Sequence, residues 1–239
     1  MIKREHWAIG LILLLYGSAP LQAASTLIEQ LSMDAYFPGV HWAQPSKNSQ
    51  VMQEWNRCLA QSKGLAGIAP SSQAWIENRL NLPLPDYRNR EQKTFDWHQL
   101  NRDKSLNLIL DPGDYLSWSD VPSVIFVLDQ KGVTALPYVP NQDVREYLSM
   151  FDSSRPVSGL WWVTPAGHAQ QAPSKLIGWR RQPLLPGALI LHPPGDLLRD
   201  RSGFLDCVAT WLGHFSYADW VRLSGLSNGR ERLSAVGPD

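Results

Sequence analysis

Between residues 121 and 193, a run of short apolar segments around one helical segment constrains the fold more than any other feature of this chain. Two strand-turn-strand patterns flank the helical pattern, and a Leu-Pro-Gly turn introduces a last strand. The predicted strands are 123–129, 133–137, 160–164, 169–172 and 188–192, and the predicted helix is 143–149. This ββαβββ order predicts a small sheet wrapped round one helix. The segment shows no evident catalytic constellation, so it indicates a binding or assembly module.

The balance of charge argues against a nucleic-acid-binding protein. Twenty-two basic residues offset 22 acidic residues, and no run of Lys and Arg forms the basic stripe that neutralises phosphates. The hydrophobic content of 44% with 18% charged residues is typical of a globular chain, not of a disordered one.

The first 23 residues have the pattern of a secretory signal peptide. Lys3 and Arg4 precede an apolar run at 7–16, and small residues follow, with cleavage expected after Ala23. The alternative is an uncleaved membrane anchor, but the apolar run is shorter than the roughly 20 residues that span a bilayer. We therefore expect a mature protein in an exported compartment, with no transmembrane segment.

Two cysteines in an exported chain raise the question of a disulfide. Cys58 and Cys207 both fall on predicted helices that could pack together. A bond between them would close a loop of about 150 residues and stabilise the fold by roughly 5 kcal/mol in the chain-entropy description. The alternative, two buried inert thiols, stays open at this point.

The remaining segments predict a helical hairpin, a pair of strands and a C-terminal helix. The hairpin consists of helices at 47–62 and 73–80, with Ser71 and Ser72 as candidate caps. The two strands, 106–110 and 115–118, surround an Asp-Pro-Gly-Asp turn. The C-terminal helix is predicted over 197–215 and carries an apolar stripe, and the tail from Val221 is expected to fray.

Several short motifs, in order, resemble the capsule biosynthesis GfcC-like family, including its YjbG-type members from exopolysaccharide gene clusters. The motifs are Asp143-Val144, Tyr147-Leu148-Ser149, the run Trp161-Trp162-Val163-Thr164-Pro165-Ala166-Gly167, Gln170-Gln171-Ala172-Pro173, Trp179, and Leu185-Pro186-Gly187-Ala188-Leu189-Ile190. A weaker similarity covers residues 36–40, the helical pair and residues 108–112.

The resemblance implies an α+β fold of two β-grasp-like modules, the second of them SLBB-like. The expected divisions are a discontinuous first module (24–45 and 103–121), a helical hairpin insertion with its loop (46–102), a second module (122–195) and a C-terminal helix with tail (196–239). It also implies a periplasmic accessory protein for capsule or exopolysaccharide assembly and export. Its partners would be the polysaccharide or outer-membrane polysaccharide export proteins. The opening strand of the first module is hard to find in this sequence.

A polysaccharide site would combine aromatic rings for the flat C–H faces of sugars with polar side chains for the hydroxyls. Trp161 and Trp162 are adjacent on a predicted strand and so point to opposite faces, one into a core and one outward. The residues expected to contact the ligand are Trp162, Trp179, Arg180 and Arg181, with Arg102, which the resemblance suggests lines a cleft. The alternative is that most of the 11 Trp residues fill cores and that Arg102 is a solvated loop charge.

The apolar stripe of the C-terminal helix is the expected surface for a protein partner. It comprises Leu205, Val208, Trp211, Leu212 and Phe215. The stripe could instead dock on its own module or on a membrane surface, and its two flanking arginines are few for an anionic lipid surface.

The sequence favours a protein without catalytic activity, metal or cofactor. The histidines show no metal-ligand spacing, and neither a Gly-x-Ser-x-Gly motif nor a phosphate-binding glycine loop is present. The rival hypothesis is a carbohydrate-modifying enzyme of hydrolase or lyase type with a site between the modules. Asp111 and Asp114 could supply its paired carboxylates, although they flank a Pro-Gly turn in which Asp is common.

Overall fold

A computed structural model describes residues 40–44, 48–65, 67–80, 82, 102–103, 109–111, 114–151, 160–172, 182–199, 203–226 and 231–235. These residues form five α-helices, a 3₁₀ helix and two β-sheets, so the chain has a mixed α+β fold, as expected. The predicted signal peptide lies outside the described residues. So do Trp179, Arg180 and Arg181.

The larger sheet has five strands and confirms the predicted ββαβββ order. The elements are β3 (Val124–Leu128), β4 (Val133–Pro137), α6 (Val144–Phe151), β5 (Trp161–Val163), β6 (Ala169–Gln171) and β7 (Leu189–Leu191). The strand order is β4-β3-β7-β5-β6, and β3 and β7 are parallel whereas the other pairs are antiparallel. The last strand therefore lies in the centre of the sheet, between the two hairpins.

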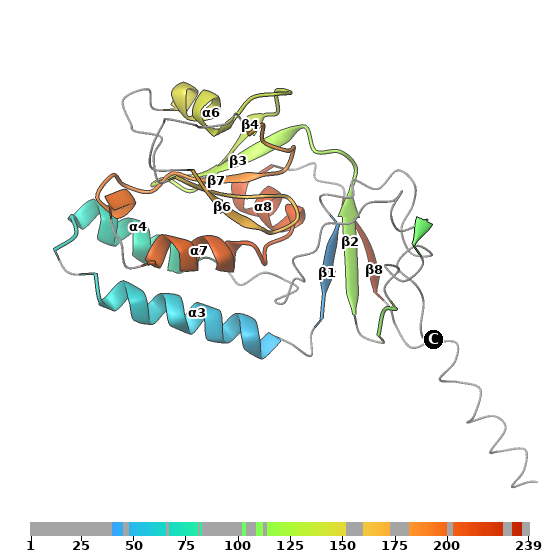
Figure 1. Cartoon of the computed structure of the whole chain (residues 1–239), viewed down its shortest axis with the longest axis horizontal. Helices are drawn as coiled ribbons and strands as arrows, with labels where there is room; N and C mark the ends of the chain where they lie inside the picture. Colours follow the sequence, from blue (N-terminus) through green and yellow to red (C-terminus); the bar gives the residue numbers. More distant parts are fainter. Residues whose placement is uncertain are drawn as a thin grey trace, which may run out of the picture.

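Both faces of this sheet are covered by helices (Figure 1). Along β3, Ile125 and Val127 pack in a core with Tyr147 of α6. The alternate residues Phe126 and Leu128 belong to a second core on the other face. Because side chains alternate along a strand, the apolar run of β3 supplies both cores, as expected of a strand buried on two sides.

The second core holds the helices of the hairpin and the C-terminal region. These are α3 (Asn48–Lys63), α4 (Pro70–Leu80), the 3₁₀ helix η4 (Leu197–Arg199), α7 (Phe204–Leu212) and α8 (Tyr217–Ser224). Both helices of the predicted hairpin are present, and they pack against the same core as α7. The hairpin thus packs across the five-stranded sheet.

The C-terminal region differs from the single helix and frayed tail that the sequence predicted. The helix is divided into η4 and α7, and α7 begins after Gly203, whose φ of 79° is left-handed. A further helix, α8, begins at Tyr217 with Ser216 as its N-cap and ends at Ser224 with Gly225 as its C-cap. The prediction of fraying from Val221 was wrong, because Val221 is buried in the core and a strand follows α8. Local Ser, Gly and charge content did not reveal these long-range contacts.

The smaller sheet joins three segments that lie far apart in the sequence. Its strands are β1 (His41–Ala43), β2 (Tyr115–Ser119) and β8 (Glu231–Ala235), antiparallel in the order β1-β2-β8. The sequence predicted β2, but β8 falls in the segment expected to be tail. Of the other predicted strand, residues 106–108 lie outside the described part of the chain.

Candidate functional site

The adjacent tryptophans of β5 point to opposite faces of the sheet, as predicted. Trp162 belongs to the α6 core and is 3% exposed, so its ring is not presented to a ligand. Trp161 is half-buried at the edge of the opposite core. The sequence-based choice of Trp162 as the contact residue therefore needs correction, and Trp161 is the better candidate. The sequence alone allowed either Trp161 or Trp162 to be the exposed ring, since exposure depends on which helices cover each face of the sheet.

Trp161 lies beside an edge of the sheet that carries exposed amide side chains. It pairs with Gln171 of β6, and Gln170 is the next residue along that strand. Both glutamines are exposed. We define the β5–β6 edge as Trp161, Gln170 and Gln171.

The backbone of β6 adds polar groups to this edge. The hydrogen bonds from Thr164 N to His168 O (2.9 Å) and from Ala172 N to Leu160 O (2.7 Å) set the pairing between β5 and β6. In this antiparallel alternation, the N–H and C=O groups of Ala169 and Gln171 point away from β5. An indole, two amides and outward peptide groups are the chemistry that binds sugar rings and their hydroxyls.

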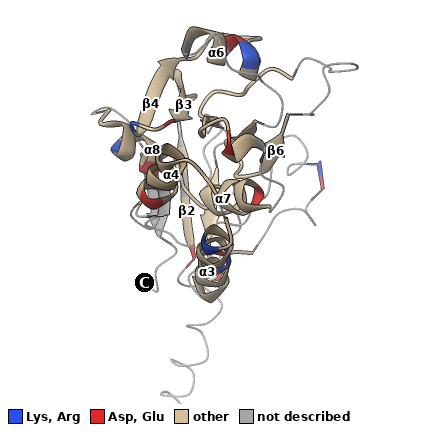
Figure 2. Cartoon of the chain, turned by 90° about the vertical axis from the view of Figure 1, so that its left-hand side faces the viewer, with Lys and Arg blue, Asp and Glu red and all other residues tan. Residues whose placement is uncertain are grey.

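Arg102, the predicted cleft residue, has an exposed side chain. Figure 2 shows that the described Lys and Arg residues lie on separate elements, including α3 and α6. The Trp179–Arg181 segment lies outside the described residues, so its predicted role stays a prediction.

The apolar stripe of the C-terminal helix is buried inside the protein. Leu205, Val208, Trp211, Leu212 and Phe215 all belong to the core on the α7 face of the sheet. The stripe therefore docks on its own sheet and hairpin, and the prediction that it binds a partner is corrected to this internal role. Burying its large apolar side chains stabilises the fold by about 1.5–3 kcal/mol each.

Three contacts between helix α3 and the α7 region define what we call the α3–α7 seam. Cys58 and Cys207 form a disulfide with an S–S distance of 2.05 Å, which resolves the question that the sequence left open. The rings of Trp55 and Trp211 lie 4.4 Å apart between centroids. Glu54 Oε2 lies 2.9 Å from His214 Nε2.

The Glu54–His214 contact is a polar tie across the seam. The His214 side chain is 7% exposed, whereas that of Glu54 is 33% exposed. The hydrogen bond with His214 is the main cause that holds the pKa of the Glu54 carboxyl below its ordinary value. Burial opposes this shift, and the charges of His214 and Arg57 add to it. The pair anchors α3 to the corner between α7 and α8.

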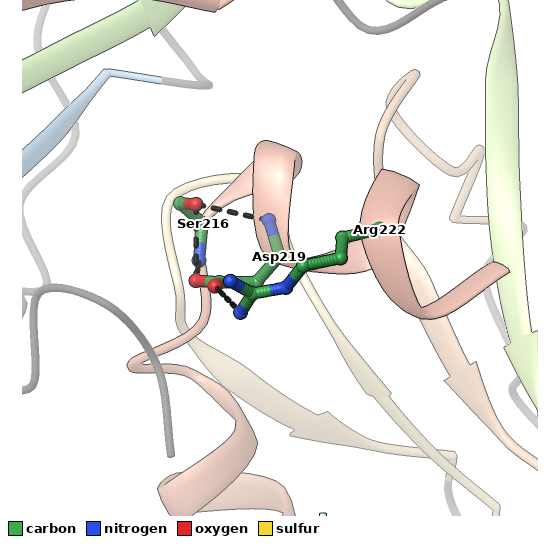
Figure 3. Close-up of polar contacts among 3 residues, drawn as sticks. All are labelled: Ser216, Asp219 and Arg222. Atoms are coloured by element: carbon green, nitrogen blue, oxygen red, sulfur yellow. Dashed lines mark hydrogen bonds and ion pairs between the residues drawn. The ribbon is translucent and has the colours of Figure 1, made fainter. Parts of the chain in front are cut away.

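The buried carboxylate of Asp219 has a structural role at the start of α8 (Figure 3). Its Oδ2 accepts hydrogen bonds from Ser216 N at 2.8 Å and Ser216 Oγ at 3.0 Å. Its Oδ1 accepts from Arg222 Nη2 at 2.7 Å. Ser216 Oγ in turn accepts from Asp219 N, which completes a capping box. These contacts explain Asp219 without a catalytic role.

Asp114, one of the paired carboxylates of the rival hypothesis, is also engaged in structure. It is buried, and its Oδ2 accepts hydrogen bonds from Trp42 Nε1 at 2.9 Å and from Asp111 N at 3.2 Å. The carboxylate thus ties the loop before β2 to β1. These hydrogen bonds explain why a buried carboxylate occurs in this turn.

Within the residues that the structure describes, no group of three or more His, Cys, Asp or Glu side chains is placed to hold a metal ion. In the same part of the chain, no helix combines the length and the hydropathy needed to cross a membrane. No protein-family profile matches the chain, and no curated protein matches it either.

Proposed function

We propose that this protein is a non-enzymatic, periplasmic accessory protein of capsule or exopolysaccharide assembly or export, which contacts the polymer or the export machinery. The observation that carries the proposal is the topology of the segment that resembles the GfcC-like family. Residues 141–194 supply α6, β5, β6 and β7 of the five-stranded sheet. The last strand inserts between two hairpins, parallel to the first strand, and this topology supports the β-grasp-like module that is part of the proposal.

The disulfide supports the proposed compartment. Disulfides form and persist in oxidising compartments such as the bacterial periplasm. Cys58 and Cys207 are bonded, and the chain begins with a signal-like segment. Both features fit export of the chain across the inner membrane.

The β5–β6 edge supports contact with a polymer. Trp161 offers part of an apolar ring, and Gln171, its cross-strand neighbour, offers an amide donor and acceptor on the same face. Gln170, which pairs with Trp162, presents its exposed amide on the other face of the edge. The edge consists of uncharged groups, so it suits the hydroxyls and C–H faces of sugar rings. Arginines such as Arg102 would add contacts to the acidic groups of an anionic polymer.

The test is incubation of the purified mature protein with exopolysaccharide from its own host, followed by measurement of polymer size and of protein retained by the polymer. We expect retention without shortening. Retention should fall in Gln170→Ala/Gln171→Ala and in Trp161→Phe, which keeps an aromatic ring in the core. Gln50→Ala is the matched control, because Gln50 is an exposed glutamine on α3.

The other outcomes would point to a different function or a different surface. Shortened chains would overturn the non-enzymatic proposal and favour the rival carbohydrate-modifying enzyme. If the polymer retains all variants as well as the unaltered protein, the β5–β6 edge is not the surface that binds the polymer. No retention of the unaltered protein would contradict polymer binding and direct the search to the export proteins.

A further inference from the structure

The disulfide of the α3–α7 seam is enclosed by the folded protein. Cys58 is 0% exposed and Cys207 is 2% exposed, and both belong to the core on the α7 face of the sheet. Trp55 and Trp211 pack together one helical turn away from the two cysteines. Cys58 and Cys207 lie 149 positions apart in the sequence, so the bond depends on α3 reaching α7.

This enclosure limits when the bond can form. Thiol–disulfide exchange needs a thiolate to attack a sulfur atom directly, and it proceeds through a mixed disulfide with the oxidant. An oxidant has no path to either sulfur once α3 is packed on α7. Oxidation must therefore begin before this packing is complete.

We infer that the unfolded or partly folded chain is a substrate of a disulfide-bearing thiol oxidant and that Cys58 is the first cysteine to react. The Cys58 thiolate attacks one sulfur of the oxidant's disulfide, and the other sulfur leaves as a thiolate. The Cys207 thiolate then attacks the Cys58 sulfur and displaces the second oxidant thiolate. In total, two protein thiols lose two electrons and two protons, and the oxidant's disulfide is reduced to a dithiol.

The order of reaction follows from the charges beside each cysteine in the unfolded chain. Arg57 directly precedes Cys58, with Glu54 four residues away, whereas Asp206 directly precedes Cys207. Asp206 is the only charged residue within four positions of Cys207. A neighbouring cation favours the thiolate and a neighbouring anion disfavours it, so Cys58 is the more ionised thiol near neutral pH. Cys58 also precedes Cys207 along the chain and leaves the ribosome first.

The order is tested with two single-cysteine variants of the mature chain, Cys207→Ser and Cys58→Ser, reduced and unfolded in urea at low ionic strength. Each is mixed with the uncharged disulfide 4,4′-dithiodipyridine, and release of thiopyridone is followed. Near neutral pH, Cys58 should react about twofold faster, since its larger thiolate fraction is partly offset by lower nucleophilicity. Equal rates, or a faster Cys207, would overturn the order.

Two controls separate charge from other causes. Arg57→Gln in the Cys207→Ser chain and Asp206→Asn in the Cys58→Ser chain should bring the two rates together. Above about pH 10, where both thiols are ionised, the advantage of Cys58 should vanish or reverse. A difference that persists in both controls would show that the adjacent charges do not set the order.

Enclosure is tested separately on the folded, oxidised protein with dithiothreitol. The bond should resist reduction under native conditions and become reducible in urea as the protein unfolds. Rapid reduction of the folded protein would overturn the requirement for oxidation before packing. This inference does not depend on polymer binding, so it can fail or hold independently of the proposed function.

Discussion

The two sheets of this protein differ in how far apart in the sequence their strands lie. The five-stranded sheet is built from residues 124–191, with each hairpin formed by neighbouring segments. The three-stranded sheet joins β1, β2 and β8 from the beginning, middle and end of the described chain. None of the described side chains of β1 and β2 belongs to either core on the five-stranded sheet. We therefore expect the locally built sheet with two covered faces to be the more stable part, and the three-stranded sheet to unfold separately from it.

The largest expected effect contrasts one buried residue from each sheet. Phe126→Ala in β3 should destabilise the five-stranded part by about 3–5 kcal/mol, because it leaves a cavity in a closed core. Leu116 of β2 is also buried, and Leu116→Ala should lower the hydrogen-exchange protection of the three-stranded sheet. The protection of the β3 region should stay unchanged. Urea unfolding combined with hydrogen exchange of β2 and β3 peptides measures both. Loss of protection in both sheets from Leu116→Ala would show that they unfold as one unit.

Removal of the disulfide is expected to have the next largest effect. Cys58→Ala/Cys207→Ala should lower the free energy of unfolding of the five-stranded part by about 2–5 kcal/mol, because a long loop is no longer closed in the unfolded chain. Urea midpoints of the oxidised, reduced and double-variant proteins provide the measurement. The reduced protein should match the double variant. An unchanged midpoint after reduction would mean that the helical packing alone holds α3 in place.

A smaller effect is expected from the long-range cap of α4. Asp196 accepts hydrogen bonds from Ala69 N at 3.0 Å and from Ser72 Oγ. Burial raises the pKa of Asp196, but these hydrogen bonds, together with those from the backbone of Asp196 and Leu197, outweigh it and hold the pKa below its ordinary value. Asp196→Ala should cost about 1 kcal/mol in thermal or urea unfolding, and Asp196→Asn less, because its amide oxygen still accepts.

Ser71→Ala is the control for the α4 cap. Ser71 is exposed and was a sequence-based candidate for the cap, but the described cap comes from Asp196. We expect a change within about 0.5 kcal/mol for this exposed substitution. A loss of stability equal to that of Asp196→Ala would show that Ser71 caps α4, as the sequence predicted.

The smallest effect concerns the pH dependence of the α3–α7 seam. The pKa of Glu54 is lowered in the folded state, mainly by His214, so its stabilising contribution is present above the ordinary value of 4.5. That contribution is lost as the pH falls through the lowered pKa. Glu54→Gln should cost less than about 1 kcal/mol near neutral pH, since the pair is partly exposed and screened.

The measurement for Glu54 is a series of urea midpoints for the unaltered protein and Glu54→Gln, from neutral pH down through 4.5. The two curves should converge at the acidic end, where the carboxyl is protonated in both folded and unfolded chains. A gap that stays constant over the whole series would attribute the loss to packing and not to the charge of Glu54.

The sequence predicted local elements well where apolar periodicity and turn residues act over a few positions. It placed β3, β4, α6, β5, β6 and β7 in the right order, and it found both helices of the hairpin. The sequence-based prediction missed β8 and took α8 for part of a helix and a frayed tail. The reason is that Ser, Gly and charged residues near the end of a chain are as typical of loops as of regular elements. Val221 became a core residue only through contact with elements far away in the sequence.

The candidate site was less predictable than the fold. Alternation along β5 required Trp161 and Trp162 to face opposite sides, but it could not rank their exposure. That ranking depends on α6 covering the Trp162 face and on β5 lying next to the edge strand β6. From the sequence, Asp114 was likewise a candidate catalytic carboxylate. In the structure it accepts a hydrogen bond from Trp42, which gives it a structural role.

The period of each strand and helix and the turns between them follow from the order of the residues, because they depend on neighbouring positions. The central place of β7 beside β3, the pairing of Cys58 with Cys207 and the inward orientation of the C-terminal apolar stripe arise only when distant segments pack together. Such pairings are chosen by the burial of apolar surface between distant segments. That free energy belongs to the packed chain as a whole and is not encoded in any one short segment.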